Sequence, residues 1–345
     1  AYACEPYRGS ESAVGWNWAV ELARSGYDVW VLTRANNQPP IDRAFLNRRK
    51  PENLHFIFFD LPRWVQKLKK GNRGVHLYYI FWQWKAYKLA KRLHQKIGFD
   101  MVHHASFVTT LQPSFMGNLG IPFIFGPVSG GECIPWPLRF KIGSRGFLID
   151  LIRDAAIFFV KNSPVMWNVF HHANRIIVTS EQTKQIIPAR FHHKVEIRLA
   201  IGIDTVPNVL PLKEKVSSRL RLLYVGHFLY WKGMEIGIRA FAEFSRHMPG
   251  ACLTMVGEGR EKQRWQRLAK RLNIEDKIQW LPWMNQDELF KLYEVHDLLL
   301  FPSLRDSGGM VVLDAFQNGL PVLCLDIGGP GILVDYRFGI QIPVV

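Results

Sequence analysis

The chain has 345 residues, of which 48% are hydrophobic, 13% aromatic and 21% charged, with a formal net charge of +15. This composition excludes a disordered chain and a small disulfide-rich scaffold, and the length suggests about two domains. No stretch reaches the roughly 20 uninterrupted apolar residues of a membrane-spanning helix, because charged residues interrupt the longest candidate, residues 146–160, at Asp150, Arg153 and Asp154.

The start of the sequence has the character of a strand that is already under way. It does not begin with Met, and residues 1–4 form a short, mostly apolar run that resembles the end of a strand. We therefore expect a chain that lacks its natural start. Its four cysteines (Cys4, Cys133, Cys252 and Cys324) are far apart and form no CxxC pair, so we expect reduced core residues of a cytoplasmic protein.

In the first half of the chain, short apolar runs alternate with longer segments of helical periodicity. The predicted strands are residues 28–33, 55–60, 100–104, 121–125, 175–179 and 195–199. The predicted helices are residues 12–25, 75–96, 106–119 and 147–171.

The second half repeats this alternation. The predicted strands are residues 220–225, 252–256, 277–281, 297–301 and 321–325, and the predicted helices are residues 235–246, 261–272, 286–294 and 310–318. Such alternation is typical of doubly wound α/β domains with parallel sheets.

A polar, proline-containing stretch separates the two halves. It predicts a first domain at residues 1–205, a linker at 206–219 and a second domain at 220–345. Two such domains would face each other across a cleft, and the carboxyl ends of their strands would direct ligand sites into it.

The positive charge is concentrated in the first half. Residues 221–345 carry 14 basic and 14 acidic residues, so the whole excess lies in residues 1–220. Within residues 41–100, 14 Lys and Arg residues alternate with aromatic ones: Trp64, Tyr78, Tyr79, Phe81, Trp82, Trp84 and Tyr87.

Two interpretations of this basic, aromatic region stay open. It is either a solvated helix face with a buried aromatic stripe or a surface that contacts anionic lipid. Nucleic acid would also favour a basic patch. However, the sequence contains no helix-turn-helix, RNA-binding aromatic signature or zinc finger, so we expect no nucleic-acid partner.

The densest candidate site is the turn after the predicted strand at residues 297–301. Gly308 and Gly309 allow backbone N–H groups to approach an anion at the start of a helix. Asp306 and Asp314, eight residues apart, would place one carboxylate near a sugar and one near ribose hydroxyls. An ordinary N-cap followed by a solvated helix Asp is the alternative.

The turn after residues 220–225 carries a second signal. Gly226 begins it, and His227 and Lys232 follow as two donors that could reach a diphosphate. A lysine exposed on a surface loop is the alternative. Gly257 begins a third turn that is generic by itself.

In the first half, Gly9, Ser10 and Glu11 occupy the first strand-to-helix turn, where a phosphate-binding loop would fall. They do not form the GxGxxG pattern of dinucleotide-binding folds. His103 and His104 end a predicted strand, where a histidine can hydrogen-bond a sugar or share a proton. A structural histidine is the alternative.

Together these turns resemble the retaining GT-B glycosyltransferases of family 4, also called group 1, and specifically their bacterial exopolysaccharide and lipopolysaccharide branch. The resemblance is carried in family order by residues 226–233, 257–259, 302–303, 319–322 and 326–330, by the Asp306 and Asp314 pair, and by residues 3–6, 9–11 and 15–17. It implies the GT-B fold, with two Rossmann-like domains facing a central cleft. The family ends in a helix beyond the position of Val345, so we expect a chain truncated at both ends.

The resemblance also implies a nucleoside-diphosphate-sugar donor and no cofactor. Asp314 would bind ribose, Lys232 and His227 the diphosphate, and Asp306 the transferred sugar. The complete set of implied donor-binding residues is Gly226, His227, Lys232, Gly257, Ser307, Gly308, Gly309, Met310 and Asp314.

The residues implied in catalysis are His103, His104, Asp306 and Lys232. Either histidine would lie near the donor sugar and the acceptor hydroxyl, and the loop formed by Gly9, Ser10 and Glu11 would approach the phosphates. The family retains anomeric configuration without an evident enzyme nucleophile. We therefore expect metal-independent transfer that depends on electrostatic stabilisation of the leaving diphosphate.

This chain departs from the family at the charged positions. Asp306 and Asp314 stand where the family usually has Glu, and His227 stands where it has Arg. Histidine lacks the permanent charge and the two-pronged hydrogen bonding of a guanidinium, so we expect weaker and more pH-sensitive diphosphate binding.

The charge distribution suggests the acceptor and the location. A basic first half fits a saccharide or lipid-linked saccharide acceptor presented at an anionic membrane, with the protein peripheral on its inner, cytoplasmic face. The alternatives are a degenerate or truncated GT-B protein that binds nucleotide-sugar or membrane without turnover, and a GT-B-fold sugar-nucleotide epimerase.

Overall fold

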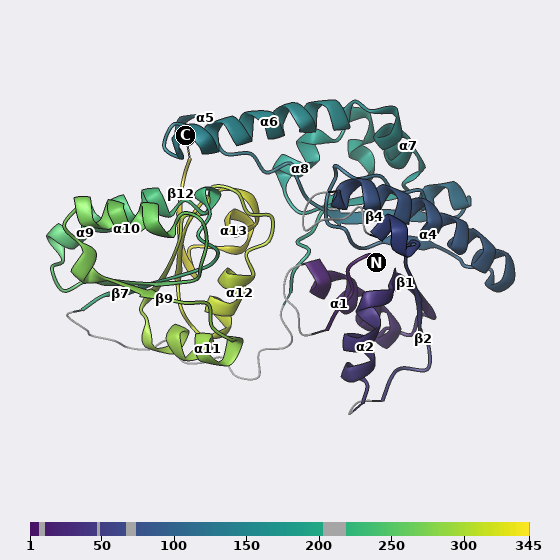
Figure 1. The fold of residues 1–345 in the computed structure, drawn as a ribbon, viewed down its shortest axis with the longest axis horizontal. Coiled ribbons are helices and arrows are strands. Elements are labelled where there is room, and N and C mark those ends of the chain that lie inside the picture. Colours follow the sequence, from purple (N-terminus) through teal and green to yellow (C-terminus); the bar gives the residue numbers. More distant parts are fainter. Residues whose placement is uncertain (7–10, 47–48, 67–73, 203–218, 345) are drawn as a thin grey trace. The chain divides into compact units, whose positions relative to one another are not determined.

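The fold is described from a computed structural model, in residues 1–6, 11–46, 49–66, 74–202 and 219–344. Parallel strands alternate with helices through these residues (Figure 1). Contacts within the chain define two compact units. One comprises Ala1–Gly131 with Ala156–Ala200, and the other comprises Glu132–Ala155 with Ile201–Val345.

The first unit contains two parallel sheets. One pairs β1 with β2, and the other has the order β3-β4-β5-β6. The strands are β1 (Val29–Arg34), β2 (Leu54–Phe59), β3 (Val102–His104), β4 (Phe123–Val128), β5 (Arg175–Val178) and β6 (Val195–Ile197). The α-helices are α1 (Glu11–Arg24), α2 (Gln38–Ala44), α3 (Arg63–Gln66), α4 (Val75–Ile97), α7 (Pro164–His172) and α8 (Glu181–Ile186).

The first residues of the chain connect these two sheets. The amino group of Ala1 donates to the Leu32 oxygen at 3.0 Å, and the Tyr2 N–H donates to the Ser106 oxygen at 3.4 Å. The buried Tyr2 side chain packs edge-on against Tyr79 and Trp82 of α4. This segment therefore contributes to the core that α4 covers.

The second unit contains one six-stranded parallel sheet of order β12-β11-β10-β7-β8-β9. Its strands are β7 (Arg221–Val225), β8 (Cys252–Val256), β9 (Ile278–Leu281), β10 (Leu298–Phe301), β11 (Val322–Leu325) and β12 (Gly339–Ile342). Its α-helices are α5 (Trp136–Arg139), α9 (Met234–His247), α10 (Lys262–Arg271), α11 (Gln286–Val295), α12 (Met310–Gln317) and α13 (Gly328–Leu333).

Alternating residues of β7 show how this sheet is covered on both faces. Leu222 and Tyr224 pack with the core under α9 and α10, whereas Leu223 and Val225 pack with the core under α11 and α12. Because side chains of a strand point to opposite faces in turn, a continuous apolar run such as β7 belongs to a sheet buried on both sides. The parallel α/β class predicted from sequence is confirmed.

The helix predicted at residues 106–119 is wrong. Only a 3₁₀ turn at its end, Met116–Leu119, is helical. Pro113 lacks an N–H and disfavours helix in the residue before it. The segment instead binds the loop after β4, because the Thr110 N–H donates to the Ser129 oxygen at 2.7 Å and the Ser129 hydroxyl donates to the Val108 oxygen at 2.9 Å.

The single helix predicted at residues 147–171 is two helices, α6 (Gly143–Lys161) and α7. Ser163 caps α7 by accepting from the Met166 N–H at 3.3 Å, and Pro164 occupies its first turn. Both features begin a new helix rather than continue an old one. Residues 143–155 of α6 belong to the second unit, an excursion that the sequence did not indicate.

In the described part of the chain, no helix combines the length and apolarity needed to span a membrane.

The buried Trp265 of α10 gives a test of the second core. Its side chain is 1% exposed among Phe228, Met234 and Tyr224, so Trp265→Ala should lower the free energy of unfolding by about 3–5 kcal/mol. Trp283, in the same unit but 58% exposed, is the matched control and should change it by less than about 1 kcal/mol. Urea unfolding followed by circular dichroism measures both, and equal losses would contradict this core.

Candidate functional site

Turns that follow β7, β8, β10 and β11 meet at one edge of the six-stranded sheet. These strands are neighbours and parallel, so their carboxyl ends lie at the same edge. The turns approach so closely that side chains are excluded. A Cβ atom on Gly257 would lie 2.0 Å from the Gly226 oxygen, and one on Gly233 would lie 1.9 Å from the Pro302 oxygen.

The turn after β10 is also tied to the turn after β11. The Gly329 N–H donates to the Asp306 backbone oxygen at 2.8 Å. A Cβ atom on Gly329 would lie 2.4 Å from the Gly308 oxygen. The glycine signals noted in the sequence therefore mark one continuous backbone surface.

Lys232 and Asp306 form an ion pair on this surface. The Lys232 Nζ lies 2.5 Å from Asp306 Oδ2, and the two side chains are only 18% and 16% exposed. Asp306 Oδ1 also accepts from the Gly308 N–H at 3.4 Å. Sequence reasoning gave these residues separate ligands, a diphosphate and a sugar, and did not foresee that they bind each other.

Asp314 lies on α12 with its side chain almost buried. Burial raises the pKa of its carboxyl from 3.8 to about 6. Among the described residues, no donor is hydrogen-bonded to this carboxylate, although Asn318 donates to its backbone oxygen at 2.7 Å. A carboxylate held in this way can accept hydrogen bonds from the hydroxyls of a sugar.

Tyr293 of α11 is a neighbour of Asp314 that the sequence did not single out. Its hydroxyl is buried and has no hydrogen-bond partner among the described residues. Burial, and secondarily the negative charge of Asp314, raise the pKa of this hydroxyl. The only available signal was its position on the face of α11 that meets the sheet.

The α12 helix begins directly after the glycine pair. Gly309 adopts φ of +95°, a conformation that glycine accommodates, and Met310 is the first helical residue. A helix of this length carries partial positive charge at its start. Ser307, Gly308 and Gly309 therefore line the approach to a site suited to an anion.

His227 is exposed, and its ring stacks on the exposed Trp283 with centroids 5.1 Å apart and an angle of 12°. The Tyr224 hydroxyl donates to its backbone oxygen at 3.1 Å. Trp283, in the loop after β9, is another residue that sequence reasoning did not identify. An aromatic side chain after a strand end was the signal that could have found it.

The two candidate histidines of the first unit project to opposite sides of β3. His103 Nε2 is hydrogen-bonded to the Gly126 oxygen at 2.6 Å, and its ring lies edge-on to Trp18. His104 is buried against Phe125 with Nε2 3.2 Å from the Tyr79 hydroxyl. Burial lowers the pKa of His103 to about 4 and that of His104 to about 3, so both are neutral at pH 7.

Of the predicted loop at residues 9–11, Gly9 and Ser10 lie outside the described residues. Glu11 is the first residue of α1, and its carboxylate accepts from the Val108 N–H. Burial raises the pKa of Glu11. No group of three or more His, Cys, Asp or Glu side chains among the described residues could hold a metal ion.

The raised pKa of Asp314 predicts a pH-dependent penalty. The unfolded carboxyl ionises near pH 3.8 and the folded one near 6, so the contribution of this carboxyl to folding stability should fall as pH rises between these values and then stay constant. The shift corresponds to about 3 kcal/mol at pH 7. Asp314→Asn should therefore gain about that much free energy of unfolding over the parent between pH 4 and pH 7, measured by urea titration. A difference independent of pH would contradict the raised pKa.

Comparison with known proteins identifies relatives of the chain. The family profile described as "Glycosyl transferases group 1" matches residues 212–340. The D-inositol 3-phosphate glycosyltransferase of Segniliparus rotundus is 32% identical over an alignment that covers 94% of this chain and 71% of the relative. An uncharacterized glycosyltransferase of Haemophilus influenzae is 27% identical over 48% of this chain and 45% of its own length. The chain thus spans less than half of some relatives that it matches.

Solved structures share the fold. Anabaena Alr3699/HepE in complex with UDP is 15% identical with a TM-score of 0.58, covering 97% of this chain and 84% of that one. The lipopolysaccharide outer core galactosyltransferase WaaB is 14% identical with a TM-score of 0.59, covering 99% and 84%. These similarities confirm the GT-B class with two Rossmann-like domains. Because the S. rotundus relative is similar over nearly the whole chain, the protein belongs to the group 1 glycosyltransferases.

Proposed function

We propose that this chain binds a nucleoside-diphosphate sugar at the edge of the six-stranded sheet. It transfers the sugar with retention of configuration and without a metal ion. The observations that carry the proposal are the Lys232–Asp306 ion pair and the almost buried Asp314 carboxylate, which lies on the helix that follows the Asp306 turn. The structure of Alr3699/HepE contains UDP, which supports a nucleotide ligand for the same fold.

In the proposed complex, Asp314 accepts hydrogen bonds from the ribose hydroxyls and Lys232 contacts the diphosphate. The diphosphate competes with Asp306 for the ammonium group of Lys232. Asp306 is then free to accept a hydrogen bond from a hydroxyl of the transferred sugar. Backbone N–H groups at the start of α12 add to the positive potential around the phosphates.

The chemical step in this proposal depends on charge stabilisation. Negative charge develops on the diphosphate as the glycosidic bond breaks, and donors held in place beforehand stabilise it. Lys232, with His227 in a supporting role, supplies this stabilisation. We assign no enzyme nucleophile. The expected contact of His103 with the sugar stays a prediction, and the burial of His104 leaves it without a proposed role.

Lys232 gives the direct test of transfer. Lys232→Ala should lower kcat/KM for the donor by about 10²–10³, equivalent to roughly 2.7–4 kcal/mol, because a positioned donor to the leaving group is lost. UDP, GDP and ADP sugars, each with a saccharide acceptor, are the substrates to assay. Before the assay, a thermal-shift screen with the free nucleotides identifies the base.

Two control variants make this result specific. Lys270→Ala removes an exposed lysine from α10 of the same unit and should leave kcat/KM within twofold. Asp314→Ala should abolish the nucleotide-induced thermal shift. Parent-like turnover of Lys232→Ala would reject the assignment, and a nucleotide shift without any turnover would favour the alternative of a binding protein.

The acceptor in this proposal is a saccharide or lipid-linked saccharide at an anionic membrane, as in the family 4 branch for exopolysaccharide and lipopolysaccharide synthesis. The α4 helix supports it. Tyr78, Tyr79 and Trp82 are core residues, as the first interpretation of the aromatic stripe stated, but Phe81 and Trp84 are 50% and 43% exposed.

The same helix carries exposed lysines. Lys85, Lys88 and Lys91 are exposed on α4, and the Lys88 ammonium lies 3.6 Å from the centre of the Trp84 ring. Exposed aromatics beside lysines are suited to the headgroup region of an anionic bilayer. These features support the second interpretation, contact with anionic lipid, for this face of α4.

Vesicle binding tests this surface. Lysines near an anionic membrane contribute about 1 kcal/mol each, so Lys88→Ala/Lys91→Ala should lower the partition coefficient about 30-fold on vesicles rich in phosphatidylglycerol. Lys270→Ala/Lys291→Ala removes two exposed lysines from the other unit and is the matched control. Co-sedimentation at two salt concentrations measures the binding. If both double variants bound the vesicles equally, or if the parent bound neutral vesicles as well as anionic ones, the role of α4 would be contradicted.

A further inference from the structure

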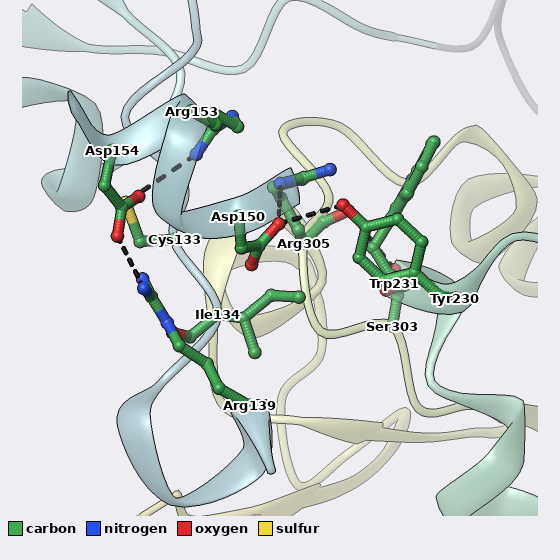
Figure 2. A network of polar contacts seen from close by, with 10 residues as sticks. All are labelled: Cys133, Ile134, Arg139, Asp150, Arg153, Asp154, Tyr230, Trp231, Ser303 and Arg305. Carbon is green, nitrogen blue, oxygen red and sulfur yellow. Dashed lines mark hydrogen bonds and ion pairs between the residues drawn. The ribbon is translucent and has the colours of Figure 1, made fainter. Parts of the chain in front are cut away.

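A buried carboxylate outside the predicted site joins two of its turns. Asp150 lies on the part of α6 that belongs to the second unit, and its side chain is only 2% exposed. Its Oδ1 atom accepts from the Tyr230 hydroxyl and from Arg305 Nη1, both at 2.9 Å (Figure 2). Tyr230 lies within the motif segment 226–233, but none of these three side chains has a role in the proposed donor contacts.

The two donors come from the turns that carry the Lys232–Asp306 ion pair. Tyr230 belongs to the 3₁₀ turn Tyr230–Lys232, two residues before Lys232. Arg305 immediately precedes Asp306. One carboxylate oxygen therefore fixes the separation of two side chains whose backbones lead directly into the ion pair.

Further contacts hold the same turns together. The Leu304 N–H donates to the Trp231 oxygen at 2.8 Å, and the Arg305 guanidinium lies 4.9 Å from the centre of the Trp231 ring. The buried Leu304 packs with Ile134 and Ile142 of the 132–155 segment. Asp150 is thus the charged centre of a contact that is otherwise apolar and backbone-mediated.

The Arg305 side chain is 15% exposed, so its charge is largely removed from water. Removing one partner of a buried ion pair leaves the other charge uncompensated and drives it to a new position. If Asp150 loses its charge, Arg305 must move toward solvent or toward another carboxylate. The closest one along the chain is Asp306, the partner of Lys232.

A second ion pair in the same segment offers a comparison with Asp150. Asp154, one helical turn later, pairs with the 4%-exposed Arg139 of α5 at 2.6 Å. That pair lies within the 132–155 segment, and among the residues that the structure describes it has no hydrogen bond or ion pair to a turn of the candidate site. The two aspartates thus provide a matched comparison between positioning and general stability.

We infer that Asp150 is a positioning residue, which acts through Tyr230 and Arg305 to hold Lys232 against Asp306 in the geometry that receives the donor diphosphate. This inference rests on the proposed function, which supplies the role of the Lys232–Asp306 pair. It adds to that function a residue 156 positions before Asp306 in sequence, on an element outside the strand-to-helix turns.

The test compares Asp150→Asn with Asp154→Asn by two independent measurements. The first is kcat/KM for the donor, which Asp150→Asn should lower at least tenfold and Asp154→Asn by less than twofold. The second needs no activity: the rate at which a small acylating reagent modifies Lys232, followed by peptide mass spectrometry. Asp150→Asn should raise that rate several-fold relative to Lys262 and Lys277, because the ion pair that protects Lys232 is loosened, whereas Asp154→Asn should not.

Tyr230→Phe removes one of the two hydrogen bonds to Asp150 and should fall between the parent and Asp150→Asn in both measurements. Melting temperatures of all variants are measured in parallel, and the comparison uses conditions where each is folded. An unchanged Lys232 acylation rate in Asp150→Asn would overturn the inference, as would an equal effect of Asp154→Asn. If the parent neither binds nor turns over any nucleotide sugar, the proposed function fails, and the acylation rates alone decide whether Asp150 positions Lys232.

Discussion

Within the second unit, the Gly226 carbonyl oxygen and the Cα of Gly257 are so close that a methyl group between them would overlap the oxygen. The same is true of Gly233 and Pro302 and of Gly329 and Gly308. Side chains cannot intervene, so the turns form a surface of backbone groups. The donor binding that we propose depends on these close approaches, because they set the positions of Lys232, Asp306 and the start of α12 relative to one another.

Charge at this surface is balanced before any ligand arrives. Lys232 and Asp306 neutralise each other while largely removed from water, and such a pair gains little net stability because desolvation offsets the attraction. An incoming diphosphate therefore exchanges one anionic partner of Lys232 for another. Asp314 is different, since its buried carboxylate has a raised pKa and gains most when a ligand donates hydrogen bonds to it.

Local sequence patterns predicted most of the strands, since buried parallel strands are continuous apolar runs bounded by turn residues. β12 (Gly339–Ile342) was missed because it is short and has exposed residues at alternate positions. The helix predicted at residues 106–119 failed because tertiary hydrogen bonds to the loop after β4 replaced helical ones. Helical periodicity alone cannot distinguish a helix from a segment whose backbone is hydrogen-bonded to a distant loop.

The candidate site was predictable in its residue types but not in its pairings. Glycines and carboxylates after strand ends marked the turns. The Lys232–Asp306 pair was hidden because its two residues are 74 positions apart and meet only because β10 lies beside β7. Asp150 was visible only as a charge that interrupts an apolar run.

The membership of residues 132–155 in the second unit makes that unit discontinuous in sequence. A polypeptide cut at the linker would contain every strand of the six-stranded sheet, yet it would lack the carboxylate that compensates Arg305 and the aliphatic side chains that cover Leu304. In such a fragment, the Arg305 guanidinium would have no Asp150 partner and the apolar Leu304 side chain would be exposed, both beside the candidate ligand-binding turns. A division of this protein into separate domains therefore has to follow the contacts rather than the linker. During synthesis, the 132–155 segment leaves the ribosome before the rest of its unit and can pack only after that part has been made.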